Sequence, residues 1–379
     1  MMQLNRRIFS TYSLLSLASI SAPAFAQSEG KIVLGQSAPF TGPSAELGLR
    51  FNEGAQLYFD AVNAKGGVHS RQIELRKADD GYEPERTAAN TRKFISDGVL
   101  ALFGYVGTPT TLAALPLATA AKIPLIAPFT GATGLREPFN RYILHVRASY
   151  DDETQAIVRH AASIGQTKIA VFYQNDAYGK AGLNGVSVAL QKMGQKPIAV
   201  GDVERNSVDV KQAVSAIVAA KPQAIVQISS YLTSAAFIRA TRATGFTGAF
   251  YNVSGVGTQA LSQALGTEAR GVVISQVMPF PFSPKSPIAS EYMAAIKAAN
   301  KPTLVPNYSG IEGFVAAKVL VEALQRAGRA PTSEALINAF DSIQKFNLGG
   351  FSVDFSAQKH MGSQFVEMTI LTETGGVVH

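Results

Sequence analysis

A regular alternation of short apolar runs with longer amphipathic stretches is the feature that most constrains how this chain can fold. Lys31–Ala38, Gln72–Lys77 and Leu100–Phe103 have the length and composition of buried strands. In Ala45–Asn63 and Pro84–Asp97, which lie between these runs, apolar residues recur at helical spacing. Because strands that alternate with helices usually form parallel sheets covered by helices on both faces, the pattern predicts an α/β fold.

The same alternation continues to about residue 278 and is then interrupted. The further predicted elements are helices at Thr110–Ala121, Asp152–Ile164 and Gly182–Met193 and strands at Pro124–Pro128, Lys168–Phe172, near Ala199, Ala224–Ile228, Ala249–Tyr251 and Val272–Ser275. The proline-rich segment 279–284 excludes a helix or a central strand. After it we predict helices at Ile288–Asn300, Asn307–Gly328 and Ser333–Phe340 and short strands near Phe351–Asp354 and Phe365–Leu371.

Length and composition indicate two domains and narrow the classes of function. At roughly 150 residues per domain, a chain of 379 residues forms about two lobes, with a cleft between them. The chain has no cysteine, which excludes disulfides, cysteine-based metal sites and thiol catalysis. Its formal net charge of +7 is spread along the sequence, so nucleic-acid binding is not expected.

The N-terminus predicts export. Arg6 and Arg7 precede the apolar stretch Tyr12–Ile20, and residues 24–26 form a small-x-small cleavage site. The apolar stretch is shorter than the roughly 20 residues that span a bilayer. We therefore predict a signal peptide over residues 1–26 and a mature protein in the bacterial periplasm that is not embedded in the membrane. The Sec pathway is the expected route, and the arginine pair leaves twin-arginine export open.

Catalytic and cofactor motifs are missing from the sequence. The five histidines do not have metal-ligand spacing, and no phosphate-binding Gly-x-x-x-x-Gly-Lys motif occurs. Gly255–Ala260 has a Gly-x-Gly-x-x-Ala pattern, but the next predicted strand does not end in the acid that a dinucleotide site needs. Asp79 and Asp80 follow a strand, and we interpret them as loop-capping residues. We expect a protein that is not an enzyme and needs no cofactor or metal.

Polar loops at the strand ends are the candidate ligand site, because open α/β sheets bind ligands there. Gly104–Thr111 leads from a strand into a helix, whose first amides and threonine hydroxyls suit a carboxylate. The alternative is that the threonines only cap the helix. Pro128–Gly134 follows the neighbouring strand, and across the cleft Asn175–Gly179 offers the phenol of Tyr178 on a turn.

The order and spacing of these segments resemble those of the leucine/isoleucine/valine-binding protein family, the periplasmic type I solute receptors of ABC importers. The resemblance covers the mature chain and rests on Ala38–Gly48, Val62–Val68, Asp79-Asp80, Gly104–Thr111, Ile126–Thr133, Asp176–Gly179 and Phe250–Gly257. It implies two Rossmann-like lobes joined by three crossovers that close over a ligand by a hinge motion. The implied lobes are 31–148 with 279–347, and 149–278 with 348–379.

The resemblance also implies which residues hold the ligand. A hydroxyl residue in the first loop and groups of the second loop grip its carboxylate, and tyrosines of the second lobe complete the site. One family tyrosine aligns with Ser230, and Tyr231 follows it. The residues assigned in this way are Thr108, Phe129, Thr130, Gly131, Tyr178, Ser230, Tyr231 and Ser254.

The chain departs from the family where the ligand's α-ammonium would bind. The family's acidic partner for that group aligns with Ser254, and its pocket tryptophan aligns with Leu47. A buried ammonium without a counter-charge costs several kcal/mol. We therefore hypothesise a carboxylate ligand with an apolar or aromatic body, such as an aromatic or short oxo acid. If a water or Asp152 replaces the missing acid, an aliphatic amino acid is the alternative.

The predicted function is capture of a small carboxylate and its delivery to an ABC permease and its ATPase subunits by a monomeric receptor. The walls of the pocket are expected to come from Tyr105, Phe129, Tyr178 and Phe282. Two alternatives stay open, an amide- or urea-type sensor of the same fold and a secreted α/β hydrolase.

Overall fold

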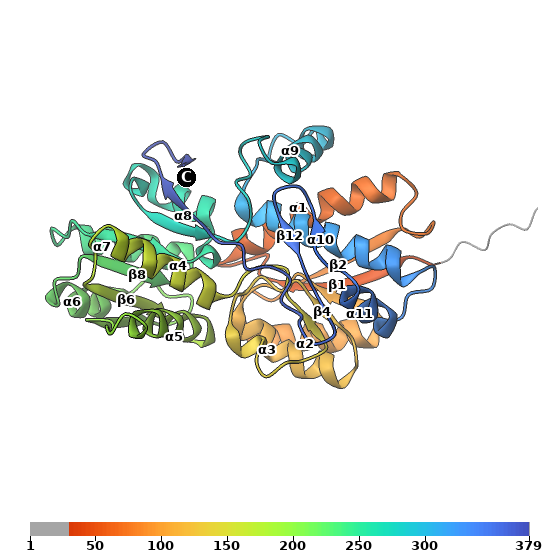
Figure 1. The fold of residues 1–379 in the computed structure, drawn as a ribbon, viewed down its shortest axis with the longest axis horizontal. Helices are drawn as coiled ribbons and strands as arrows, with labels where there is room; N and C mark the ends of the chain where they lie inside the picture. Colours follow the sequence, from red (N-terminus) through yellow and green to blue (C-terminus); the bar gives the residue numbers. More distant parts are fainter. Residues whose placement is uncertain (1–29, 379) are drawn as a thin grey trace, which may run out of the picture.

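Two separate sheets divide the protein into two α/β lobes in the computed structural model, which describes residues 30–378 (Figure 1). The first sheet is parallel throughout, with strand order β2-β1-β3-β4-β5. The second has the order β14-β13-β10-β9-β8-β6-β7 and is parallel except at β13 and β14. The predicted α/β class with two parallel sheets is confirmed. The predicted signal peptide, residues 1–26, lies outside the described residues.

The first lobe combines the N-terminal strands and helices with three helices from near the C-terminus. Its strands are β1 (Ile32–Ala38), β2 (Ile73–Asp79), β3 (Ala101–Phe103), β4 (Leu125–Ile126) and β5 (Ile143–Leu144), and its helices are α1 (Ala45–Ala64), α2 (Pro84–Ser96), α3 (Thr108–Ala120), α9 (Pro287–Ala299), α10 (Tyr308–Ala327) and α11 (Ser333–Asp341). Helices α1 and α10 pack closely because Gly54 meets the backbone of α10. A Cβ atom added at Gly54 would lie 1.8 Å from the carbonyl oxygen of Gly310.

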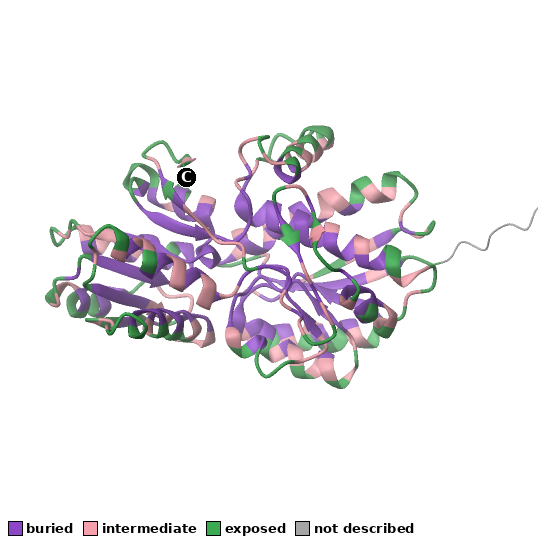
Figure 2. Ribbon diagram, in the orientation of Figure 1, coloured by how far each residue is buried: buried purple, intermediate pink, exposed green. Residues whose placement is uncertain are grey.

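The second lobe is formed mainly by the middle of the chain. Its strands are β6 (Ile169–Gln174), β7 (Val200–Val203), β8 (Ala224–Ile228), β9 (Ala249–Asn252), β10 (Val273–Gln276), β13 (Glu367–Leu371) and β14 (Val377–Val378), and its helices are α4 (Tyr150–Ser163), α5 (Ala177–Gln191), α6 (Lys211–Ala219), α7 (Tyr231–Arg242) and α8 (Thr258–Leu265). Every residue of β8 is buried, as expected for a central parallel strand with helices on both faces. Figure 2 shows that burial follows the strands and that exposed residues lie on the outer sides of the helices.

The last part of the chain returns to both lobes. The small hairpin of β11 (Phe346–Asn347) and β12 (Ser352–Val353) packs into the core of the first lobe, and Met361 forms a bridge with His145. Strand β13 then pairs with β10 of the second sheet. The division of the chain into lobes remains our proposal. Because β11, β12 and Met361 contact the first lobe and β13 belongs to the second sheet, we place the last boundary between residues 363 and 367 and not at residue 348.

One predicted helix begins five residues earlier in the structure than expected. Helix α5 begins at Ala177 and not at Gly182, so Tyr178 lies in the first turn of a helix and not on a turn before it. The reason is the N-cap, because the Asp176 carboxylate accepts hydrogen bonds from the amides of Tyr178 (2.9 Å) and Gly179 (3.2 Å). Within residues 30–378, no helix combines the length and the apolar character that crossing a membrane requires.

Candidate ligand-binding site between the lobes

The two predicted loops of the first lobe meet at a pair of buried threonines. The hydroxyl oxygens of Thr108 and Thr130 lie 2.7 Å apart, and both side chains are buried. A bridge between Val106 and Phe129 brings the loops together. Thr110 and Thr111 hydrogen-bond backbone carbonyls of the preceding turn, whereas Thr108 does not. Bonds to the backbone at the start of α3 therefore occupy the hydroxyls of those two threonines, although neither caps the helix, and they leave Thr108 for another role.

Two tyrosines of the second lobe converge on the turn Ser254–Val256. The rings of Tyr150 and Tyr178 are 5.4 Å apart, and a Cβ atom added at Gly255 would lie 3.1 Å from both hydroxyl oxygens. The Tyr150 hydroxyl is hydrogen-bonded to Thr130, which links it to the threonine pair. The Tyr178 hydroxyl is buried and has no hydrogen-bond partner. Burial raises the pKa of Tyr178 well above its ordinary value, so the phenol stays neutral and can donate a hydrogen bond.

A buried arginine that the sequence analysis did not identify lies at the centre of this cluster. Arg147 follows β5 in a crossover between the lobes, and its side chain is 1% exposed. Its Nη2 lies 3.3 Å from Glu153 and also contacts the hydroxyl of Ser254, and its Nη1 lies 3.4 Å from Glu312. The guanidinium lies 4.8 Å from the centre of the Phe129 ring. The arginine therefore joins both lobes and both sets of predicted binding residues.

Glu153 is the acid that contacts Ser254. The suggestion that Asp152 replaces the family's acidic partner for the ligand ammonium is wrong. Asp152 instead forms a capping box with Ser149 at the start of α4. Glu153 accepts hydrogen bonds from the amide (2.7 Å) and hydroxyl (3.0 Å) of Ser254 and from the hydroxyl of Ser275 (2.6 Å). The sequence held one indication that Glu153 is buried. Glu153 follows Tyr150 by three residues, so both side chains lie on the same face of α4, which is the buried face.

A second buried acid faces the same arginine from the first lobe. Glu312 lies on α10 and is 5% exposed. Burial raises the pKa of Glu312 to about 7, although the attraction of Arg147 lowers it. Helix α10 is buried on nearly all sides, so an acidic residue within it was an indication of a functional position that we did not use at first.

The remaining predicted residues do not all join this cluster. Ser230 hydrogen-bonds Thr233 (3.1 Å) at the start of α7, and the hydroxyl of Tyr231 reaches backbone at Glu46 of the first lobe. Ser230 and Tyr231 are therefore buried near the interface, but no contact joins them to the Thr108–Thr130 pair. Gly131 does belong to the cluster, because its carbonyl accepts a hydrogen bond from the amide of Tyr150 (2.7 Å).

One of the expected pocket walls is wrong. The Tyr105 hydroxyl is bonded to Thr91 of α2 (3.1 Å), and its ring is fully buried in the core. The direction of this side chain was set by tertiary packing. Phe282 packs against Phe280 and Tyr308, and its place in the pocket wall stays a prediction.

The lobes touch each other along the rim of the site. Glu83 at the start of α2 accepts hydrogen bonds from Arg205 (2.6 Å) and Asn206 (3.0 Å) of the second lobe. The hydroxyl of Tyr82 is bonded to Gln174 at the end of β6. A cavity of about 40 Å³ lies between the lobes where Leu47 and Arg50 face Gly257 and Gln259. These contacts describe a closed arrangement of the two lobes.

The acidic pair Asp79-Asp80 organises loops, as the sequence analysis interpreted it. Asp79 accepts hydrogen bonds from the amides of Phe40 (2.8 Å) and Thr41 (3.1 Å). Burial alone would raise its pKa, but hydrogen bonds from the Thr41 hydroxyl and nearby amides lower the pKa of Asp79 to about 2. Burial raises the pKa of Asp80 to about 6. Among residues 30–378, no group of acids and histidines has the arrangement of a metal site.

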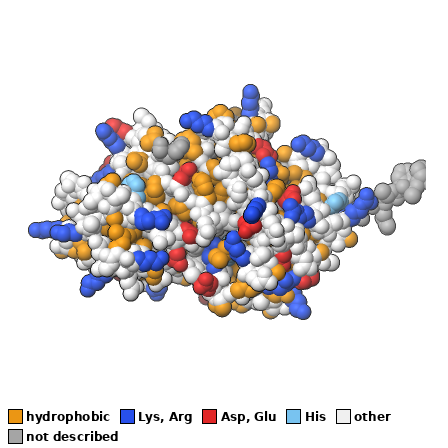
Figure 3. All heavy atoms as spheres, viewed as in Figure 1, with side chains coloured by type: hydrophobic (Ala, Val, Ile, Leu, Met, Phe, Trp, Pro, Cys, Tyr) orange, Lys and Arg blue, Asp and Glu red, His pale blue; other side chains and the backbone are white. Residues whose placement is uncertain are grey.

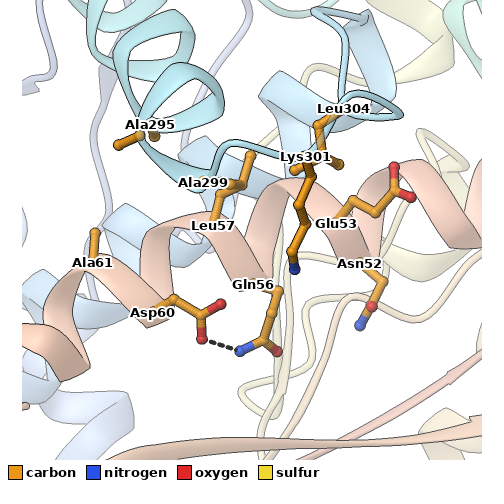
Figure 4. Close-up of a pocket in the computed structure, with 11 residues that line it drawn as sticks. Asn52, Glu53, Gln56, Leu57, Asp60, Ala61, Ala295, Ala299, Lys301 and Leu304 are labelled. Atoms are coloured by element: carbon orange, nitrogen blue, oxygen red, sulfur yellow. Dashed lines mark hydrogen bonds between the residues drawn. The ribbon is translucent and has the colours of Figure 1, made fainter.

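A larger cavity lies elsewhere on the first lobe, between α1 and the end of α9 (Figure 4). It measures about 450 Å³ and is lined by Asn52, Glu53, Gln56, Leu57, Asp60, Ala61, Ala295, Ala298, Ala299, Lys301 and Leu304. None of the predicted binding residues lines it. On the face shown in Figure 3, basic and acidic side chains are interspersed, which agrees with the mild net charge.

Comparison with known proteins gives consistent matches along the chain. The model of a protein family described as "periplasmic binding protein" matches residues 31–375. Leu/Ile/Val-binding protein homolog 3 of Brucella melitensis is 23% identical over 344 residues, which cover 89% of each chain. The crystal structure of a substrate-binding periplasmic protein from Ralstonia solanacearum has a TM-score of 0.86 at 33% identity and covers 92% of this chain and 99% of that one. A possible leucine/isoleucine/valine-binding protein from Rhodopirellula baltica has a TM-score of 0.87 at 31% identity, with coverage of 91% and 95%.

Proposed function

We propose that this chain, which belongs to the periplasmic binding protein family, captures a small carboxylate-bearing solute between its lobes and delivers it to an ABC permease. Members of this family are solute-binding proteins and not enzymes, and several of the relatives that match here are named Leu/Ile/Val-binding proteins. The proposed place of action is the periplasm. The energy for transport comes from the partner ATPase subunits, since the sequence has no nucleotide motif of its own.

The observation that carries the proposal is the group of hydrogen-bond donors collected from both lobes at one point of the interface. The threonine pair comes from the first lobe, Tyr178 from the second, and Arg147 from a crossover between them. A carboxylate has two acceptor oxygens and a negative charge, so it is the kind of group that such donors bind.

Closure of the lobes gives this arrangement a mechanism of capture. Donors held on separate lobes reach the same small ligand only when the lobes close, so the ligand favours the closed state. Each hydrogen bond from a buried donor to a carboxylate contributes about 1.5–3 kcal/mol. The rim contacts of Glu83 with Arg205 and Asn206 add to the stability of the closed state.

Native mass spectrometry of the protein purified from its own periplasm tests the proposal. We expect a bound small acid, released on denaturation and rebound by the refolded protein. A bound neutral amide would favour the sensor alternative, and a neighbouring regulator gene in place of permease and ATPase genes would support that reading. Turnover of the rebound compound would instead identify an enzyme.

A further inference from the structure

The carboxylate of Glu153 is the acid nearest to the expected position of a ligand ammonium, but its hydrogen-bonding capacity is already used. One oxygen accepts from the hydroxyl of Ser254 (3.0 Å) and faces Arg147 (3.3 Å). The other accepts from the amide of Ser254 (2.7 Å) and the hydroxyl of Ser275 (2.6 Å). A carboxylate accepts about four hydrogen bonds, so an ammonium would have to displace one of these donors.

The charges around this point are also balanced without a ligand. The guanidinium of Arg147 lies between Glu153 and Glu312, at 3.3 and 3.4 Å. A second buried guanidinium, Arg136, donates to the carbonyl oxygens of Arg147 and Ala148, both at 3.2 Å. Arg147 thus pairs with both buried carboxylates, and Arg136 adds a second buried positive charge nearby, so Glu153 is not left as an uncompensated negative charge that could hold an added cation.

Donors, in contrast, are in excess at the same place. Nε of Arg147 and the hydroxyl of Tyr178 are buried and have no hydrogen-bond partner, whereas Nη1 of Arg147 faces the carboxylate of Glu312 at 3.4 Å. An arginine nitrogen can only donate, and the neutral phenol of Tyr178 is able to donate. Buried donors without acceptors are costly, so a ligand that brings acceptor oxygens to them gains binding energy.

We infer, on the basis of the proposed function, that the solute has no α-ammonium and carries a hydrogen-bond acceptor in its place, as a 2-oxo carboxylate does. Arg147 is the specificity-determining residue, because it neutralises Glu153 and supplies the unpaired donor Nε. An amino acid would bring three donors and a positive charge to a point that already holds a guanidinium. We expect it to bind roughly 100-fold more weakly than the matching 2-oxo acid, or worse.

Calorimetry on denatured, ligand-stripped and refolded protein tests this inference with matched pairs. The pairs are L-leucine with 4-methyl-2-oxopentanoate and L-phenylalanine with phenylpyruvate, which differ only at the α position. Tighter binding of the oxo acid in at least one pair, with its amino acid about 100-fold weaker, supports the inference. Equal or tighter binding of the amino acid overturns it and leaves carboxylate capture intact. If neither oxo acid binds, the inference is overturned, and the native mass spectrometry described above tests carboxylate capture separately.

Variants of Arg147 supply the second test. Arg147→Met should reduce the preference for the oxo acid, because Glu153 is then free to accept an ammonium. If loss of the buried cation prevents folding, the double variant with Glu153→Gln removes both charges and should abolish the preference in either direction. Arg141→Met is the matched control, because Arg141 pairs with Glu334 at the surface and should leave the preference unchanged. An unaltered preference in the Arg147 variants would show that another residue sets it.

Discussion

Replacement of Tyr178 by phenylalanine should stabilise the ligand-free protein and weaken ligand binding at the same time. The Tyr178 side chain is 4% exposed, and its hydroxyl has no hydrogen-bond partner. A buried hydroxyl of this kind costs about 1–3 kcal/mol. The phenylalanine ring keeps the contact with Tyr150, so the variant loses the penalty and little else.

The size of both effects follows from the same hydroxyl. Without it, the free energy of unfolding of the stripped protein should rise by about 1 kcal/mol. With ligand, the variant lacks one hydrogen bond to a carboxylate, worth about 1.5–3 kcal/mol, so affinity should fall roughly 10- to 100-fold. Urea unfolding of stripped protein measures the first effect, and calorimetry with the acid identified from the native protein measures the second.

Tyr150→Phe is the matched control for this experiment. The Tyr150 hydroxyl is bonded to Thr130 and to the backbone of Gly131, so its removal should lower the stability of the stripped protein by about 1 kcal/mol. Opposite signs for the two variants are therefore expected. Equal destabilisation by both, together with unchanged ligand affinity in Tyr178→Phe, would refute the placement of Tyr178 as an unpaired donor in the site.

Three further predictions concern charge and packing. The pKa of Glu312 is raised to about 7, so the folded state binds more protons than the unfolded state between about pH 4.5 and 7, and stability should fall as pH rises through this range. Glu312→Gln should remove about 3 kcal/mol of this pH dependence in urea unfolding, and parallel curves for wild type and variant would contradict it. Glu83→Gln should weaken ligand binding by a factor of about 2–5 through loss of its partly exposed pair with Arg205, and an effect that does not shrink at high salt would exclude this cause. Gly54→Ala should destabilise the first lobe by about 2 kcal/mol or more, because the added methyl group would clash with the backbone of α10. Gly134→Ala is the control and should not destabilise the protein, because a Cβ atom there meets no atom within 4 Å. Equal melting temperatures of the two variants would refute this packing.

Much of the site in the first lobe was predictable because it depends on local chain geometry. Loops that follow neighbouring parallel strands must end at the same edge of a sheet, so Thr108 and Thr130 were expected to be near each other. Position in the chain did not reveal the direction of each side chain. Tyr105 lies in the first of these loops, yet its hydroxyl points to α2.

The sequence by itself determined the α/β class, the two similar lobes and the tail of three helices, because hydrophobic periodicity and proline act over a few residues. The tertiary structure alone decided the charge pattern of the site. Arg147, Glu153 and Glu312 come from a crossover and two helices, and they meet because both lobes fold around them. Buried charges persist only where partners of opposite sign reach them, and those partners are set by three-dimensional packing and not by spacing along the chain.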